Sequence, residues 1–120
     1  MALGLTLSTA IAADQPRSTL DIYWNDVEGG GATLIVTPAG ESILIDSGNP
    51  GARDSGRIYK TTQVAGLTKI DYYITTHFHT DHFGGAAELS KLIPIGQVFD
   101  KSIPSLVFGM LVIKIQMTSN

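Results

Sequence analysis

All three histidines of this chain, His77, His79 and His82, fall within six consecutive residues, and Asp81 lies among them. Neutral imidazole nitrogens and carboxylate oxygens are ligands that suit zinc, iron or manganese. The chain has no cysteine, which excludes a thiolate site. The cluster therefore predicts a divalent-metal site formed by His77, His79, Asp81 and His82. A chance group of polar residues on a surface loop and a purely structural metal are the alternatives.

The spacing within the cluster indicates how the ligands divide. His77 and His79 are two residues apart, so in an extended segment both imidazoles project to the same side and can share one ion. Asp81 and His82 fall where the chain turns into a helix, and we expect their side chains to leave in a different direction, toward a second ion. Asp81 is also a candidate catalytic residue, because a carboxylate beside the metal can orient a bound water and handle its proton.

The elements around the cluster are typical of an α/β active site. The apolar segment Ile70–Thr75 predicts a buried strand, and Phe83–Leu92 predicts a helix that follows the cluster. A strand end that leads into a loop and a helix is where open α/β sheets place their sites. The pair Gly84-Gly85 allows the helix backbone to approach the site without Cβ clashes.

The rest of the chain divides into short elements. Trp24 is expected in the core, and Gly29–Gly31 is expected to form a flexible turn, because no Lys-Ser/Thr follows it to make a phosphate loop. The pattern predicts strands at Thr19–Trp24, Ala32–Thr37 and Ser42–Asp46, with a hairpin turn at Pro38–Glu41 between the last two. It predicts a helix at Asp54–Ala65 that stops at Gly66.

Composition sets bounds on the class of protein. A chain of 120 residues, 43% of them hydrophobic, buries one modest core and is expected to form one domain. The net charge of −3 provides no basic surface for nucleic acid. The lack of cysteine leaves the redox compartment open.

The two ends of the chain differ from its middle. Met1–Ala12 is apolar and ends in Ala10-Ile11-Ala12, which resembles the end of a secretory signal and predicts a periplasmic or secreted protein. An apolar N-terminal tail or strand is the alternative, and the segment is too short for a transmembrane span. Leu106–Met117 is a dense apolar run, expected to be a strand or residues that follow a break in the reading frame. We therefore divide the chain into a signal-like leader (1–18), a partial domain (19–104) and an unassigned apolar tail (105–120).

The pattern His-x-His-x-Asp-His followed by Gly-Gly resembles the signature of the metallo-β-lactamase superfamily of metal-dependent hydrolases. The resemblance covers about residues 20 to 104, and the opening Leu20–Gly48 is similar to the branch related to competence-type DNA-uptake proteins. It implies an α/β fold, here the N-terminal half of a four-layer αββα sandwich, which we expect to be truncated.

The resemblance also implies roles for individual residues. His77 and His79 would serve a first metal, and Asp81 and His82 a second. Asp46 would be the buried aspartate that supports the ligands without binding metal. Without the resemblance, Asp46 is a turn residue after a strand.

The chain departs from the family pattern in one respect. A complete member takes a third histidine, a bridging aspartate and a final histidine from its second half, whereas this chain has no histidine after His82.

The resemblance implies a hydrolase with one or two zinc ions (or iron or manganese) that attacks an ester, amide, thioester or phosphoester of a small molecule. The alternative is a metal-binding fragment or interaction domain without turnover. Antibiotic hydrolysis by a true β-lactamase is a third possibility.

Overall fold

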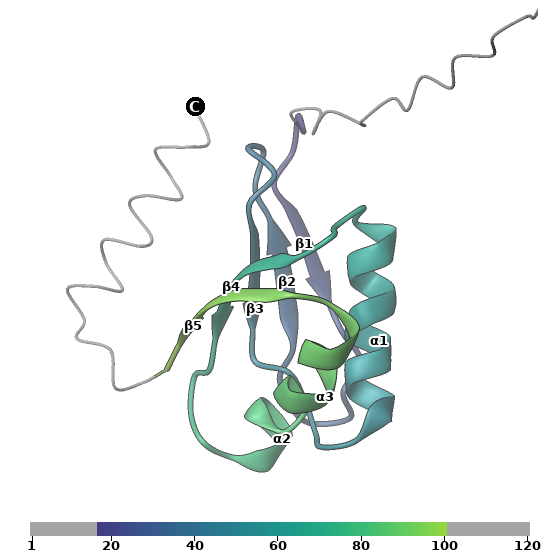
Figure 1. The fold of residues 1–120 in the computed structure, drawn as a ribbon, viewed down its shortest axis with the longest axis vertical. Coiled ribbons are helices and arrows are strands. Elements are labelled where there is room, and N and C mark those ends of the chain that lie inside the picture. Colours follow the sequence, from purple (N-terminus) through teal and green to yellow (C-terminus); the bar gives the residue numbers. More distant parts are fainter. Residues whose placement is uncertain (1–16, 101–120) are drawn as a thin grey trace, which may run out of the picture.

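The computed structural model describes residues 17–100, which form a five-stranded sheet and three helices (Figure 1). The strands are β1 (Asp21–Trp24), β2 (Thr33–Val36), β3 (Ser42–Ile45), β4 (Ile70–Ile74) and β5 (Ile95–Phe99). The helices are α1 (Ala52–Val64), α2 (Thr80–Phe83) and α3 (Ala86–Leu92).

The order of the strands in the sheet follows the order in the chain. Strands β1, β2 and β3 pair antiparallel, and the predicted hairpin between β2 and β3 is confirmed, with the Thr37 amide donating to the Glu41 carbonyl at 2.9 Å. Strands β3, β4 and β5 pair parallel, so helical crossovers must connect them. The carboxyl ends of β3, β4 and β5 therefore meet at one edge of the sheet, at the end near α2 in Figure 1.

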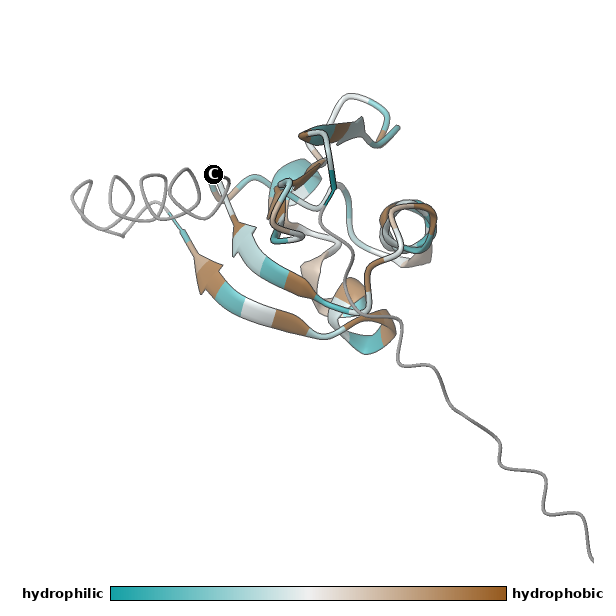
Figure 2. Cartoon of the chain, turned by 90° about the horizontal axis from the view of Figure 1, so that it is seen from above, coloured by the Kyte–Doolittle hydropathy of each residue, from teal (hydrophilic) through white to brown (hydrophobic). Residues whose placement is uncertain are grey.

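The main core lies between the sheet and the two longer helices. Ile58 of α1 and Leu89 of α3 are fully buried against the strands. The strand residues of this face follow the register Leu34–Leu44–Tyr73, so side chains of one parity point toward the helices. Strands β4 (IDYYI) and β5 (IGQVF) begin and end in apolar residues with more polar residues between them, as the brown and teal bands of Figure 2 show.

The opposite face of the sheet carries a second apolar cluster made only of strand residues. Ile43 and Tyr72 at its centre are 6% and 7% exposed. Its half-buried members are Ile35, Ile45, Ile74 and Phe99. One helical layer on one sheet is half of an αββα sandwich, which confirms the predicted fold class.

Of the two predicted helices, one needs adjustment. Helix α1 matches the predicted Asp54–Ala65 closely, and Gly66 follows it with a φ of 72°. The predicted helix Phe83–Leu92 is instead divided, because Gly84 and Gly85 separate α2 from α3. The Gly85 amide donates to the Gly48 carbonyl at 3.2 Å, and a Cβ on Gly85 would overlap the Ser47 carbonyl oxygen. The glycine pair thus packs its backbone against the loop after β3.

Trp24 is not in the core: it is 79% exposed, so that prediction is wrong. It lies at the end of the edge strand β1, opposite Thr33, on the face that none of the described helices contacts. Strand β5 was not predicted, because Ile95–Phe99 lacks a clear alternation. Gly96 interrupts it, and a Cβ there would lie 2.6 Å from the Asp71 carbonyl oxygen, so glycine permits the close approach to β4.

Among residues 17–100, no helix has the length and apolar character needed to cross a bilayer. The signal-like segment Met1–Ala12 and the whole of the tail 105–120, including Leu106–Met117, lie outside the described residues.

Candidate metal centre

The three histidines come together in the turn that follows β4. The His77 ring centroid lies 4.6 Å from that of His79 and 4.0 Å from that of His82. His77 and His79 are therefore neighbours, as their spacing predicts. Contrary to expectation, the His82 ring does not leave in a separate direction, since it lies closer to His77 than His79 does. The short helix α2 begins after His79, and its single turn brings His82 back over His77.

Asp46, at the end of β3, connects this turn to the neighbouring strand. Its Oδ1 accepts a hydrogen bond from the Thr76 amide at 2.8 Å. Its Oδ2 accepts from the Thr76 hydroxyl at 2.7 Å and lies 2.8 Å from His82 Nδ1. The carboxylate is only 6% exposed. Asp46 thus contacts both sides of the histidine turn, and its role as a supporting residue of a metal site stays a prediction.

The backbone of Asp46 is itself in an uncommon conformation. Its φ is 60°, in the left-handed region that Asp and Asn tolerate better than other non-glycine residues. A conformation of this kind costs of the order of 1 kcal/mol and persists where surrounding contacts determine it. Here the Asp46 amide donates to the Ile74 carbonyl at 2.8 Å, and the side chain makes the contacts to Thr76 and His82. The strained residue lies at the candidate site.

The contact with Asp46 determines which nitrogen of His82 is available. A carboxylate only accepts hydrogen bonds, so His82 Nδ1 carries a proton and, in the neutral imidazole, Nε2 keeps its lone pair. A ligating histidine commonly donates its other ring nitrogen to a carboxylate in this way. Asp81 Oδ2 lies 3.9 Å from His82 Nε2, and the Asp81 side chain is 42% exposed. Nε2 of His82 and the carboxylate of Asp81 are therefore potential metal ligands on the same side of the turn.

Backbone contacts fix the position of α2 over the sheet. The Ser47 amide donates to the His82 carbonyl at 2.6 Å, and the Gly31 amide donates to the Asp81 carbonyl at 3.1 Å. A Cβ on Gly31 would lie 2.8 Å from His82 Nδ1, and one on Gly30 would overlap the Asp81 carbonyl oxygen. Gly30 and Gly31 therefore pack on the site. The sequence pattern predicts only a flexible turn here, although three adjacent glycines before a buried strand are also compatible with a close backbone approach.

Asp54 of α1 anchors the loop after β3 through hydrogen bonds to Asn49. It is 1% exposed, and its Oδ2 accepts from the Asn49 amide at 2.8 Å and from Asn49 Nδ2 at 3.1 Å, while Oδ1 pairs with Arg53 Nε at 2.7 Å. Burial raises the pKa of Asp54, but the hydrogen bonds from Arg53 and Asn49 outweigh it and lower the pKa to about 2. This residue was not predicted to have a role, because one aspartate in a helix carries no sequence signal.

The donor types at the turn fit a divalent metal ion. Three imidazoles and one carboxylate lie in one exposed turn, and His82 already has the tautomer that a ligand needs. Within residues 17–100, however, no group of three or more His, Asp or Glu side chains is placed to hold a metal ion.

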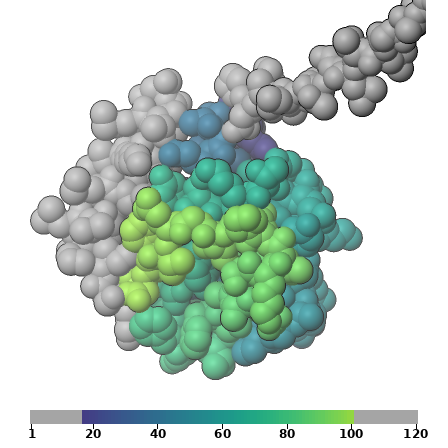
Figure 3. Space-filling view, in the orientation of Figure 1, coloured from purple at the N-terminus to yellow at the C-terminus, as the bar shows by residue number. Residues whose placement is uncertain are grey.

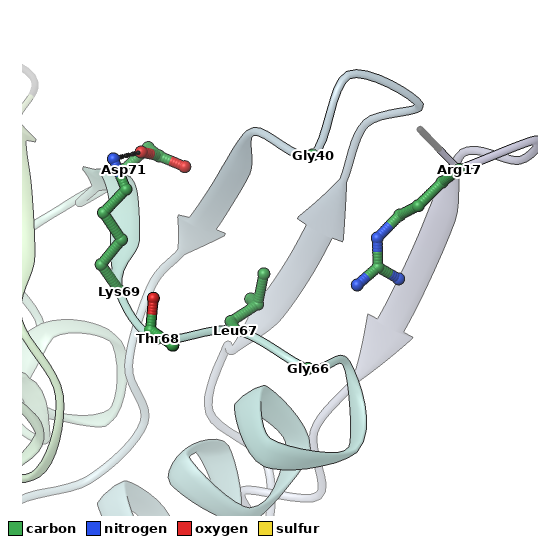
Figure 4. Close-up of a pocket in the computed structure, with 7 residues that line it drawn as sticks. All are labelled: Arg17, Gly40, Gly66, Leu67, Thr68, Lys69 and Asp71. Carbon is green, nitrogen blue, oxygen red and sulfur yellow. Dashed lines mark ion pairs between the residues drawn. The ribbon is translucent and has the colours of Figure 1, made fainter. Parts of the chain in front are cut away.

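A pocket of about 230 Å³ lies at the other end of the sheet, beside the β2–β3 hairpin (Figure 4). In the orientation of Figures 1 and 3, this hairpin is at the upper edge of the molecule and α2 is at the lower edge. The pocket is lined by Arg17, Gly40, Gly66, Leu67, Thr68, Lys69 and Asp71. None of these belongs to the histidine turn, so the pocket is separate from the candidate metal centre.

Comparison with known sequences gives one family. The sequence model described as "Metallo-beta-lactamase superfamily" matches residues 26–102. A UPF0173 metal-dependent hydrolase of Anaeromyxobacter sp. (strain K) is 35% identical over 77 residues, which are 62% of this chain and 25% of that protein. An atrochrysone carboxyl ACP thioesterase of Cryptosporiopsis sp. (strain 8999) is 35% identical over 65 residues, or 54% of this chain and 20% of that protein.

Solved structures show the same similarity. A subclass B3 metallo-beta-lactamase from a soil metagenome library is 31% identical with a TM-score of 0.52, covering 64% of this chain and 28% of the other. A beta-lactamase from Chitinophaga pinensis is 25% identical with a TM-score of 0.53, covering 82% of this chain and 37% of the other. The chain thus spans only about a quarter to a third of the length of such proteins. The competence-like branch is not distinguished by these matches and stays a prediction.

Proposed function

Because the chain belongs to the metallo-beta-lactamase superfamily, we propose that it provides part of the metal site of a metal-dependent hydrolase. The observation that carries the proposal is the contact between Asp46 and His82, at 2.8 Å, beside two further imidazoles. A metal-ligating histidine commonly donates its other ring nitrogen to a carboxylate, which is the arrangement of half-buried His82 and buried Asp46.

The residues of the turn have distinct roles in this proposal. His77, His79 and His82 bind the metal through imidazole nitrogens, and Asp81 binds through its carboxylate and orients the attacking water. Asp46 positions His82 without binding metal. Zinc, as one or two ions, suits these donors best, with iron or manganese also compatible. When bound, such an ion makes water a nucleophile near neutral pH.

The class of substrate follows from the family and from charge. We propose a small molecule with an ester, amide, thioester or phosphoester bond, because the matched proteins include one named as a thioesterase and others named as β-lactamases. The net charge of −3 disfavours nucleic acid as the substrate. Export to the periplasm or the medium is a further proposal that rests on the sequence of Met1–Ala12.

A second candidate is a metal-binding domain without turnover. In the part of the chain that the structure describes, no three such side chains are placed to hold a metal ion. This speaks against turnover by these residues alone, because catalytic zinc normally takes three protein ligands and an open position.

Elemental analysis of the purified chain tests the proposal, with His79→Ala as the matched control. We expect zinc, iron or manganese near one equivalent in the parent chain and a loss of most of it in H79A, with the far-UV circular dichroism of both unchanged. A metal-loaded chain that cleaves model esters, thioesters or phosphodiesters in a His79-dependent way supports the hydrolase, and metal without turnover supports the binding domain. A folded chain that retains no metal would contradict both.

A further inference from the structure

Thr76 is the residue of the site whose hydroxyl has two polar neighbours of different kinds. Its Oγ1 lies 2.7 Å from Asp46 Oδ2 and 3.0 Å from His77 Nδ1. Its backbone amide also donates to Asp46 Oδ1 at 2.8 Å. Thr76 therefore lies between the buried carboxylate and a histidine that does not touch that carboxylate. Neither the spacing of the motif nor the resemblance to the family indicated it.

The number of protons available decides the direction of these hydrogen bonds. The Asp46 carboxylate has no proton to give, so the single hydroxyl proton of Thr76 goes to Asp46. The lone pairs of Thr76 Oγ1 then remain to accept, and the 3.0 Å contact with His77 requires His77 Nδ1 to donate. His77 thereby carries its proton on Nδ1 and has Nε2 free. His82 has the same tautomer, since its Nδ1 donates directly to Asp46.

We propose that Thr76 is a positioning residue that transmits the orienting effect of Asp46 to His77, so that one carboxylate fixes the tautomers of two ligands. The proposal rests on the proposed metal site and extends it from His82 to His77. Asp46 Oδ2 accepts from both Thr76 Oγ1 and His82 Nδ1, and the His77 and His82 rings lie 4.0 Å apart. The arrangement leaves the Nε2 lone pairs of His77 and His82 available to bind a metal in one turn.

The substitution Thr76→Val tests the hydroxyl alone. Valine has the shape of threonine and keeps the backbone amide that anchors Asp46, but it cannot accept from His77. Thr76→Ser keeps the hydroxyl and is the rescue variant. Thr62→Val is the matched control, because the Thr62 hydroxyl is fully buried in α1 and donates to the Tyr59 carbonyl at 2.6 Å, away from the site.

The direct readout is the tautomer of each histidine, measured by long-range ¹⁵N–¹H correlation NMR of the metal-free chain at about pH 8, where imidazole is ordinarily neutral. The three histidines are assigned by single substitution. We expect the Nδ1–H tautomer at His77 and His82 in the parent chain, in T76S and in T62V. In T76V we expect His77 to change to a mixture of tautomers while His82 keeps its own.

The second readout is zinc affinity, measured by competition with a chromophoric chelator. We expect T76V to bind zinc about tenfold more weakly, and T76S and T62V to stay within about twofold of the parent chain. A T76V chain with an unchanged His77 tautomer would overturn the proposal, as would a His77 of the parent chain that carries its proton on Nε2. If the parent chain bound no zinc while the tautomers behaved as expected, the proposed function would fail and the role of Thr76 would stand.

Discussion

Two carboxylates join β3 to β4 at opposite ends of the sheet, and they do so in the same way. Asp46 accepts from the amide and the hydroxyl of Thr76 at 2.8 and 2.7 Å. Asp71 accepts from the amide and the hydroxyl of Ser42, both at 2.9 Å. Each aspartate therefore holds the neighbouring strand through two groups of one hydroxyl residue.

The third partner of each aspartate distinguishes the two ends of the sheet. Asp71 pairs with Lys69 at 2.7 Å, and the Lys69 side chain is 65% exposed. That ion pair balances the charge of the carboxylate beside the pocket, and the lysine ammonium has no lone pair that could bind a metal. Asp46 pairs with His82, whose other nitrogen stays available. The same clamp thus holds a lysine at one end of the sheet and the proposed metal ligand His82 at the other, and the difference lies in the chemistry of one side chain.

The largest effect on stability is expected from Asp46→Ala. It leaves the Thr76 amide, the Thr76 hydroxyl and His82 Nδ1 without their acceptor and places alanine at a φ of 60°, so we expect a loss of about 3 kcal/mol in the free energy of unfolding. Asp71→Ala should cost about 2 kcal/mol, because that side chain is 20% exposed and water can replace it. Urea denaturation measures both, and a smaller loss for D46A than for D71A would reverse the comparison.

Crowding at the metal end gives the next effect. Gly31→Ala places a methyl group 2.8 Å from His82 Nδ1, so we expect a loss of about 1 to 3 kcal/mol and a displaced His82. Gly56→Ala in α1 is the matched control, since no atom lies within 4 Å of its added Cβ. It should stabilise the chain by about 0.5 to 1 kcal/mol, because alanine is the better helix former. Thermal unfolding compares the two, and equal effects would show that Gly31 does not pack on the site.

Acid should weaken the aspartate contacts that hold β4 and the loop after β3. Burial raises the pKa of Asp71, but hydrogen bonds from Lys69 and Ser42 outweigh it, so the pKa is lowered; that of Asp54 is lowered to about 2. Both carboxyls are protonated more readily when unfolded, with a pKa of about 3.9. Their contribution is therefore complete above about pH 5 and is lost as the pH falls from about 4 through 2.

Urea titrations at several pH values measure this dependence. We expect the free energy of unfolding to fall by about 1 to 2 kcal/mol for Asp54 over that window. Asp54→Asn should flatten this part of the curve, and an unchanged slope in D54N would assign the acid sensitivity to other groups.

The smallest effect should come from Lys69→Ala. An ion pair with an exposed lysine contributes about 0 to 1 kcal/mol, and Ser42 continues to hold Asp71. A loss above 1.5 kcal/mol in urea denaturation, or any change in metal content, would show that the Lys69 end is more than a structural clamp.

Sequence patterns predicted the parts of the fold that depend on local chemistry. The hairpin at Pro38–Glu41, the strands on either side of it and helix α1 follow from turn residues and periodicity. The exposed position of Trp24 did not follow from the sequence pattern, because the burial of a residue on an edge strand depends on which other segments cover that strand. The histidine motif and Asp46 were found from sequence.

Thr76, Gly30 and Gly31 were not found, since their roles arise from contacts between segments far apart in the chain: Thr76 with Asp46, and the glycines with Asp81 and His82. Such contacts have no local periodicity, and only the packing of β3, β4 and α2 at one edge reveals them.

The zinc affinity of three chains tests the central claim most directly: the parent, Asp46→Asn and Asp71→Asn, each titrated against a chromophoric chelator. Asparagine keeps the size of each side chain and tolerates the left-handed conformation at position 46. We predict that D46N binds zinc at least tenfold more weakly than the parent chain, whereas D71N stays within about twofold. Equal affinities for the parent chain and D46N would contradict the assignment of the Asp46 end as the metal-holding end.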